Sequence, residues 1–181
     1  EIFRHVKSLA PDCRIAMTTG AWLSPWWLLC TDYIWLGGSD GGEIKEIKNL
    51  TPQDSGISYR DSIMYQDYME KQYVFPYWGL MTHGFWEWGG PSFEKYQDDV
   101  MMVVARGIAK YEILNSPASM SDKRFAFLSK AIAWGKANWD ILVDTRMILG
   151  NPSKAEVYGY SHIGQNAAII FVRNPQIESR N

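Results

Sequence analysis

The segment EIFRHVKSLAPDCRIAMTT (Glu1–Thr19) decides the fold class. Apolar residues recur at helical spacing over Glu1–Leu9, which predicts a helix that ends near Pro11. A short, mostly apolar segment, Cys13–Thr19, follows directly and has the character of a buried strand. A helix, a tight turn and a buried strand in this order are typical of an α/β protein.

The same alternation continues to about residue 150. We expect further helices over 58–73, 98–110 and 121–143, and further strands over 77–84 and 111–114. Ser58 and Asp61 have the spacing of a capping box, which predicts that the first of these helices begins there.

The pattern changes after the turn at 150–152. Two strand-like runs, 155–163 and 167–174, flank a Gly-Gln-Asn turn and predict a β-hairpin. The continuous apolar run within the second predicts a strand buried on both faces. We therefore expect an α/β domain over 1–150 and the beginning of a β domain over 151–181.

Composition excludes several classes of function. The 181 residues carry a formal net charge of −2, which argues against a general binder of nucleic acid or anionic membranes. No apolar run approaches the roughly 20 residues that cross a bilayer. Cys13 and Cys30 allow one disulfide or two reduced, buried thiols, and the second is favoured. Metal-ligand spacings and glycine-rich phosphate motifs are missing, so we expect no metal and no cofactor.

Both ends of the sequence lie inside patterns of regular structure. The chain opens within a helical pattern without Met and closes shortly after a strand-like run. We expect these residues to come from the middle of a longer protein.

Tryptophan is concentrated in two segments that follow predicted strands. Seven of the nine tryptophans lie between Trp22 and Trp88. Indole rings offer a flat apolar face with one polar edge, which suits the C–H face of a sugar ring. The cluster therefore indicates a carbohydrate site, although packing of the loops is the alternative for any single ring. The candidates are Trp22, Trp26, Trp35 and Trp86.

Two carboxylates and a histidine accompany these rings. A carboxyl group walled by aromatic rings has a raised pKa and can donate a proton near neutral pH. Asp40 stands directly before two glycines, where the backbone can approach a ligand, although a plain turn is the alternative. Asp32 precedes an apolar run and can instead bond backbone amides. His83 ends a predicted strand, as a ligand contact or as a structural imidazole.

These segments resemble the α-galactosidase-like glycoside hydrolases, clan D, families 27 and 36 and their relatives. The similar pieces, in chain order, are AMTTG (Ala16–Gly20), DYIWLGGSD (Asp32–Asp40), YRDS (Tyr59–Ser62), FPYWGLMTHG (Phe75–Gly84), YEILNSP (Tyr111–Pro117), VYGYSHI (Val157–Ile163) and IIFVRNP (Ile169–Pro175). The resemblance implies a partial TIM (β/α)8 barrel, about strands six to eight with their helices, followed by the start of an all-β sandwich.

The resemblance also implies retaining hydrolysis of α-galactosidic or similar linkages, with two carboxyl groups about 5–5.5 Å apart. Asp40 corresponds to the general acid/base. Asp32 is the fallback, because the run from Trp35 to Asp40 is longer than the family's usual spacing. Thr19 and Arg60 fall in the similar segments as further substrate contacts.

The family's Lys-x-Asp nucleophile pattern is absent from these residues. The resemblance therefore places the nucleophile outside the chain, and we expect the chain alone to be inactive. The implied partner is an oligosaccharide or glycoside, and the implied location of the whole protein is secreted or periplasmic. Two other interpretations stay open: a catalytically silent, carbohydrate-binding barrel relative, and an α/β domain whose aromatic residues serve packing or a protein interface.

Overall fold

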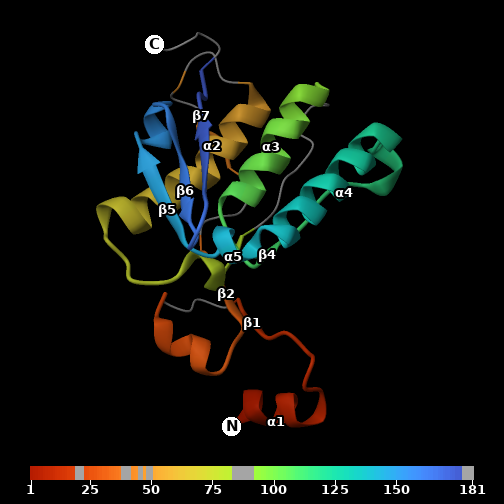
Figure 1. The fold of residues 1–181 in the computed structure, drawn as a ribbon, viewed down its shortest axis with the longest axis vertical. Coiled ribbons are helices and arrows are strands. Elements are labelled where there is room, and N and C mark those ends of the chain that lie inside the picture. Colours follow the sequence, from red (N-terminus) through yellow and green to blue (C-terminus); the bar gives the residue numbers. More distant parts are fainter. Residues whose placement is uncertain (19–22, 38–41, 45–46, 48–50, 83–91, 177–181) are drawn as a thin grey trace.

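A parallel sheet of four strands is built from residues between 16 and 111 (Figure 1). The strands are β1 (Ala16–Met17), β2 (Tyr33–Trp35), β3 (Leu80–Thr82) and β4 (Lys110–Tyr111). Their order in the sheet is their order in the chain. The computed structural model describes residues 1–18, 23–37, 42–44, 47, 51–82 and 92–176. Within these ranges the chain is a mixed α/β structure with two small sheets, neither of which closes into a barrel.

Helical segments connect the parallel strands, as parallel pairing requires. The connecting elements are η1 (Pro25–Leu29), α2 (Pro52–Tyr65) with its continuation η2 (Gln66–Glu70), η3 (Tyr77–Gly79) and α3 (Phe93–Ala105). After β4 the chain forms η4 (Pro117–Ser119), α4 (Asp122–Ala137) and α5 (Trp139–Leu142). The helix α1 (Ile2–Leu9) precedes the sheet and lies at the opposite end of the molecule from α2 and α3 (Figure 1).

The second sheet is antiparallel. It consists of β5 (Thr145–Leu149), β6 (Tyr158–Ile163) and β7 (Ala168–Arg173), with η5 (Pro152–Lys154) between the first two. The predicted hairpin is confirmed as the β6–β7 pair. The expectation that its second strand is buried on both faces is wrong. Alternate residues of β7 are exposed, as in a sheet that has one face toward solvent.

Several element boundaries differ from those expected from the sequence. The strand β2 was not predicted, because three apolar residues between polar and glycine-rich segments give too short a pattern. The capping box at Ser58 and Asp61 is wrong: α2 begins at Pro52, and the Thr51 hydroxyl accepts a hydrogen bond from the Asp54 backbone. The predicted helix over 121–143 is divided into α4 and α5 at Asn138.

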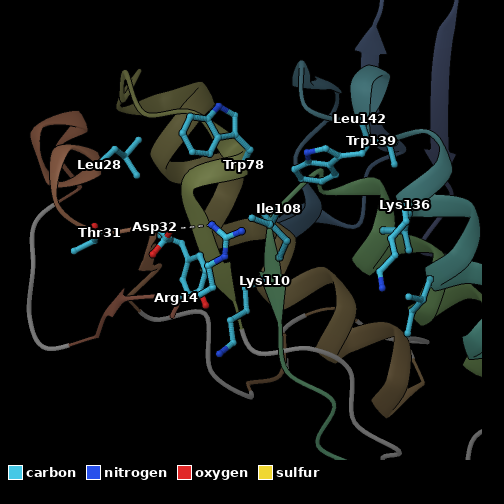
Figure 2. A pocket seen from close by; sticks show the side chains of 15 residues that line it. Arg14, Leu28, Thr31, Asp32, Trp78, Ile108, Lys110, Lys136, Trp139 and Leu142 are labelled. Atoms are coloured by element: carbon cyan, nitrogen blue, oxygen red, sulfur yellow. Dashed lines mark hydrogen bonds and ion pairs between the residues drawn. The ribbon is translucent and has the colours of Figure 1, made fainter. Parts of the chain in front are cut away.

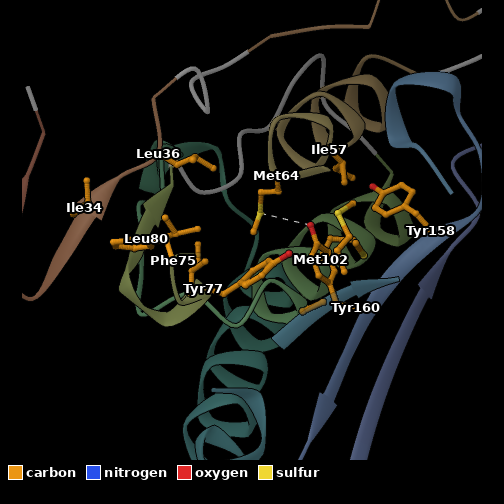
Figure 3. Packing of buried hydrophobic residues seen from close by; sticks show 13 residues of the cluster. Ile34, Leu36, Ile57, Met64, Phe75, Tyr77, Leu80, Met102, Tyr158 and Tyr160 are labelled. Atoms are coloured by element: carbon orange, nitrogen blue, oxygen red, sulfur yellow. Dashed lines mark hydrogen bonds between the residues drawn. The ribbon is translucent and has the colours of Figure 1, made fainter. Parts of the chain in front are cut away.

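One hydrophobic core joins the two sheets (Figure 3). Ile34 and Leu80 of the parallel sheet, Met64 of α2 and Tyr160 of β6 all belong to it, and all four are fully buried. The Tyr160 hydroxyl lies 3.6 Å from the Met64 sulfur. The boundary proposed at residue 150 falls between β5 and β6 of one sheet, and the division into two domains stays a prediction.

Gly107 makes the tight turn between α3 and β4. Its φ is +61°, and an added Cβ would overlap the Thr145 hydroxyl oxygen. A left-handed backbone at this close an approach requires glycine.

Cys13 and Cys30 are free thiols, as expected, but they are half-buried rather than buried. Among the described residues, no helix combines the length and the apolar character needed to cross a bilayer.

Candidate functional site

The C-terminal edge of the parallel sheet is where the sequence predicts the site. Met17 pairs with Ile34, and Trp35 pairs with Met81, so β1, β2 and β3 end side by side. Thr82, at the end of β3, is 1% exposed, and its hydroxyl has no hydrogen-bond partner among the described residues. Because buried hydroxyl groups are generally hydrogen-bonded, the Thr82 hydroxyl is available to form a hydrogen bond with another group at this edge.

Five of the predicted site residues lie outside the described residues. They are Thr19, Trp22, Asp40, His83 and Trp86. In the sequence, each follows the end of β1, β2 or β3 by a few positions. Their roles stay predictions.

Asp32 lies at the opposite end of β2 from this edge. Its carboxylate accepts hydrogen bonds from the Ile15 backbone at 2.7 Å and from Lys7 and Arg14 at 3.0 Å each. Burial raises the pKa of Asp32, but these hydrogen bonds and the lysine charge outweigh it and lower the pKa to about 2. Such a carboxyl group is ionised at neutral pH and has no proton to donate. Its contacts instead attach α1 and the segment before β1 to β2.

The other three described candidates occupy different surroundings. Arg60 is buried in α2, with its Nη2 3.4 Å from an Asp99 oxygen, so its guanidinium is directed into the protein. Trp26 is 76% exposed on η1, the segment that leads into the start of β2. Trp35 is half-buried at the end of β2. Of these candidates, only Trp35 lies at the C-terminal edge.

A buried polar network supports the core behind the sheet. Asp61 of α2 accepts hydrogen bonds from Arg106 Nε at 2.7 Å, from the Tyr158 hydroxyl at 2.6 Å and from the Tyr160 hydroxyl at 2.7 Å. Asp61, Arg106 and both tyrosines are fully buried. Burial raises the pKa of both tyrosine hydroxyls, so they stay protonated and act as donors.

Arg173 extends this network to the last strand. Its guanidinium donates to an Asp54 oxygen at 2.8 Å, to the Ser58 hydroxyl at 2.8 Å and to the Tyr158 hydroxyl at 2.9 Å. The antiparallel sheet is therefore attached to α2 by charged hydrogen bonds as well as by apolar packing. Sequence reasoning missed this network, and its only sequence signal was an aspartate at a core-facing position of a helix.

Asp99 of α3 is also a fully buried carboxylate. Burial raises its pKa to about 6, although the nearby arginines Arg60 and Arg106 oppose that shift. Gln53 also donates a hydrogen bond to it. These contacts lie between α2 and α3 and serve the packing of the two helices.

A cavity of about 830 Å³ opens at the N-terminal edge of the parallel sheet (Figure 2). Its walls come from the starts of β2 and β4, from η3 and from α4 and α5. Its described lining includes the indoles of Trp78 and Trp139 and the cations of Arg14, Lys110 and Lys136. This hollow lies at the opposite end of the strands from the predicted sugar site.

No model of a known protein family matches the chain, and no curated protein is significantly similar to it. In the ranges that the structure describes, no three histidine, cysteine or acidic side chains are grouped so that they could hold a metal ion.

Proposed function

We propose that this chain forms the sugar-binding edge of a carbohydrate-active protein, as part of a retaining glycoside hydrolase for α-galactosidic or similar linkages. The observation that carries the proposal is the alignment of the ends of β1, β2 and β3 at one edge. Neighbouring strands lie about 4.8 Å apart, so the three segments that bear the predicted site residues start within about 10 Å of one another. Residues distant in sequence can thereby serve one ligand.

The strand order supports a barrel-type arrangement. Four parallel strands follow one another without a reversal, whereas a doubly wound sheet has a point where the order reverses. In (β/α)8 barrels the active site is built at the C-terminal edge of the strands. We therefore propose that the chain contributes consecutive units of such a barrel.

Five of the predicted residues have a definite role in this proposal. Asp40 is the general acid/base, Trp22 and Trp86 stack on sugar rings, and Thr19 and His83 bond sugar hydroxyls. Asp32 and Arg60 are not included, because ion pairs and burial already occupy them. The nucleophile comes from outside these residues.

Binding is tested by tryptophan fluorescence. Methyl α-galactoside and raffinose titrated into the chain should produce a saturable change, which the double variant Trp22→Ala/Trp86→Ala should lose. The matched control, Trp139→Ala, removes an indole at the opposite edge and should leave the titration unchanged. Absence of any response at millimolar sugar would refute the proposal and favour aromatic residues that serve packing.

Catalysis is tested on a longer protein that contains these residues, with 4-nitrophenyl α-galactoside as substrate. Loss of a general acid/base lowers the rate by about 10²–10⁴-fold, so Asp40→Asn should reduce kcat by that order while sugar binding persists. A second candidate is a catalytically silent sugar-binding protein, favoured by the missing Lys-x-Asp pattern. Sugar binding without measurable hydrolysis by the unaltered protein would select it.

A further inference from the structure

The cavity at the N-terminal edge of the parallel sheet is independent of the proposed sugar site. Asp32, Trp78 and Lys110, which line it, stand at or just before the starts of β2, β3 and β4. The sugar site is proposed at the ends of the strands. We propose that this cavity binds a small aromatic anion, a flat apolar ring system that carries one oxyanion group.

The apolar part of the cavity suits a flat ring. Trp78 of η3 and Trp139 of α5 lie on either side of Ile108 (Figure 2). Each indole is 37% exposed, so both have surface that a ligand can cover. Aromatic pairs in stacked or edge-to-face contact add to the gain from apolar burial. The volume of about 830 Å³ falls within the range of roughly 300–1,000 Å³ that is usual for small-molecule sites.

The charges of the lining favour an anion. Among the described residues of the lining, Asp32 is the only acidic one, and its carboxylate already accepts hydrogen bonds from Lys7 and Arg14. Lys110 and Lys136 have no carboxylate within ion-pair distance among the described residues. The Lys110 ammonium lies 5.5 Å from the centre of the Tyr33 ring. An oxyanion beside either ammonium group would receive charge-assisted hydrogen bonds, which are about twice as strong as neutral ones.

Other ligand classes fit this lining less well. A neutral sugar needs several fixed polar partners for its hydroxyls, but aliphatic side chains such as Leu28, Ile108 and Ile132 supply much of the wall. A nucleic acid needs an extended series of cations along its phosphates. In the part of the chain that the structure describes, this cavity offers two lysines without carboxylate partners, and the chain carries a net charge of −2. An aromatic ring with one anionic substituent uses both the indoles and the lysines.

The test is a titration followed by NMR at the tryptophan indole N–H groups. The probe is naphthalene-2-sulfonate, and its comparison compounds are neutral 2-methoxynaphthalene and cationic 2-naphthylmethylammonium. The anion should bind saturably, shift the Trp78 and Trp139 signals, and bind at least about tenfold more tightly than either comparison compound. Naphthalene-2-carboxylate and 2-naphthyl phosphate, run in parallel, identify the preferred oxyanion by their relative affinities.

Two variants locate the site. The double variant Lys110→Gln/Lys136→Gln should weaken binding of the anion at least about tenfold and leave the neutral compound unaffected. The matched control is Lys130→Gln, an exposed lysine of α4 outside the cavity lining, which should bind as the unaltered chain does. Circular dichroism verifies that each variant is folded.

The proposal is overturned by an absence of saturable binding up to 5 mM naphthalene-2-sulfonate. It is equally overturned if the cationic compound binds as tightly as the anion, or if the double lysine variant binds as tightly as the control. Galactosides should not compete with the anion, because the two sites lie at opposite edges of the sheet. Failure of sugar binding would leave this result unaffected.

Discussion

The substitution Asp61→Asn tests how the antiparallel sheet is held against the helices. Asparagine keeps the size of the side chain and one acceptor oxygen, but it removes the negative charge opposite Arg106. The guanidinium of Arg106 is fully buried, and its two terminal nitrogens have no hydrogen-bond partner among the described residues. After the substitution, the charge of Arg106 is therefore buried without its ion-pair partner.

The expected loss follows from the contacts. Removing one partner of a buried ion pair costs about 3–5 kcal/mol. The three hydrogen bonds at Asp61 are part of that sum and are not added separately, since coupled contacts are not additive. Domains are stabilised by roughly 5–15 kcal/mol, so the variant should lose a large share of its stability. With a urea slope of about 2 kcal/mol per molar, the midpoint should fall by about 1.5–2.5 M.

Urea unfolding followed by circular dichroism measures this loss. The matched control is Asp98→Asn, the same substitution on α3 at a carboxylate that is 54% exposed and 3.7 Å from Lys95. An exposed pair of this kind contributes at most about 1 kcal/mol. Equal and small losses in the two variants would show that the buried charge at Asp61 is not needed, and the account of the network would be refuted.

Three further predictions concern the same fold. Tyr160→Phe removes a hydroxyl that donates to a buried carboxylate at 2.7 Å, so it should cost about 1.5–3 kcal/mol in urea unfolding. Its control, Tyr65→Phe, lies on the same core and should cost under about 0.5 kcal/mol. Gly107→Ala forces a side chain into a left-handed turn against the hydroxyl at the start of β5 and should lower the free energy of unfolding by about 1–3 kcal/mol. Its control, Gly37→Ala, has no atom within 4 Å of the added Cβ and should change that free energy by less than about 0.5 kcal/mol. Equal losses within either pair would contradict the corresponding contact. Asp32 has a folded-state pKa of about 2, below its ordinary 3.8, so its contribution is complete above about pH 4 and disappears as the pH falls toward 2. Because Lys7 and Arg14 are partly exposed and screened by solvent, Asp32→Asn should cost about 1 kcal/mol at pH 7 and almost nothing at pH 2 in urea unfolding. A loss that is the same at both pH values would contradict this.

Local sequence patterns predicted much of the architecture. The apolar spacing over Glu1–Leu9 gave α1, and the two strand-like runs around the Gly-Gln-Asn turn gave β6 and β7. These elements depend on interactions between near neighbours in the chain, which periodicity reports directly. The strand β2 depends on pairing with β1 and β3, and its three residues carry no period of their own.

The polar residues show even more clearly that local sequence patterns do not reveal tertiary contacts. Asp32 and Asp61 both stand in segments that mix polar and apolar residues, and the sequence could not tell their surroundings apart. In the structure, Asp32 is paired near the surface at the start of β2, whereas Asp61 is fully buried and bonded to Arg106, directly after α3, and to β6. Both partner sets include residues far away in the chain.

The amino-acid sequence by itself determined the mixed α/β class, the C-terminal hairpin and the placement of tryptophan-rich segments after the strands. Only the tertiary structure decided which carboxylates are already paired, which edge of the sheet carries the cavity, and how the antiparallel sheet is attached. Helix and turn preferences arise within a few residues of chain, but a side chain's burial and charge partners arise from segments as distant as Asp61 and Tyr160. Because such contacts join residues far apart in the sequence, local sequence patterns cannot report them, and only the folded structure shows them.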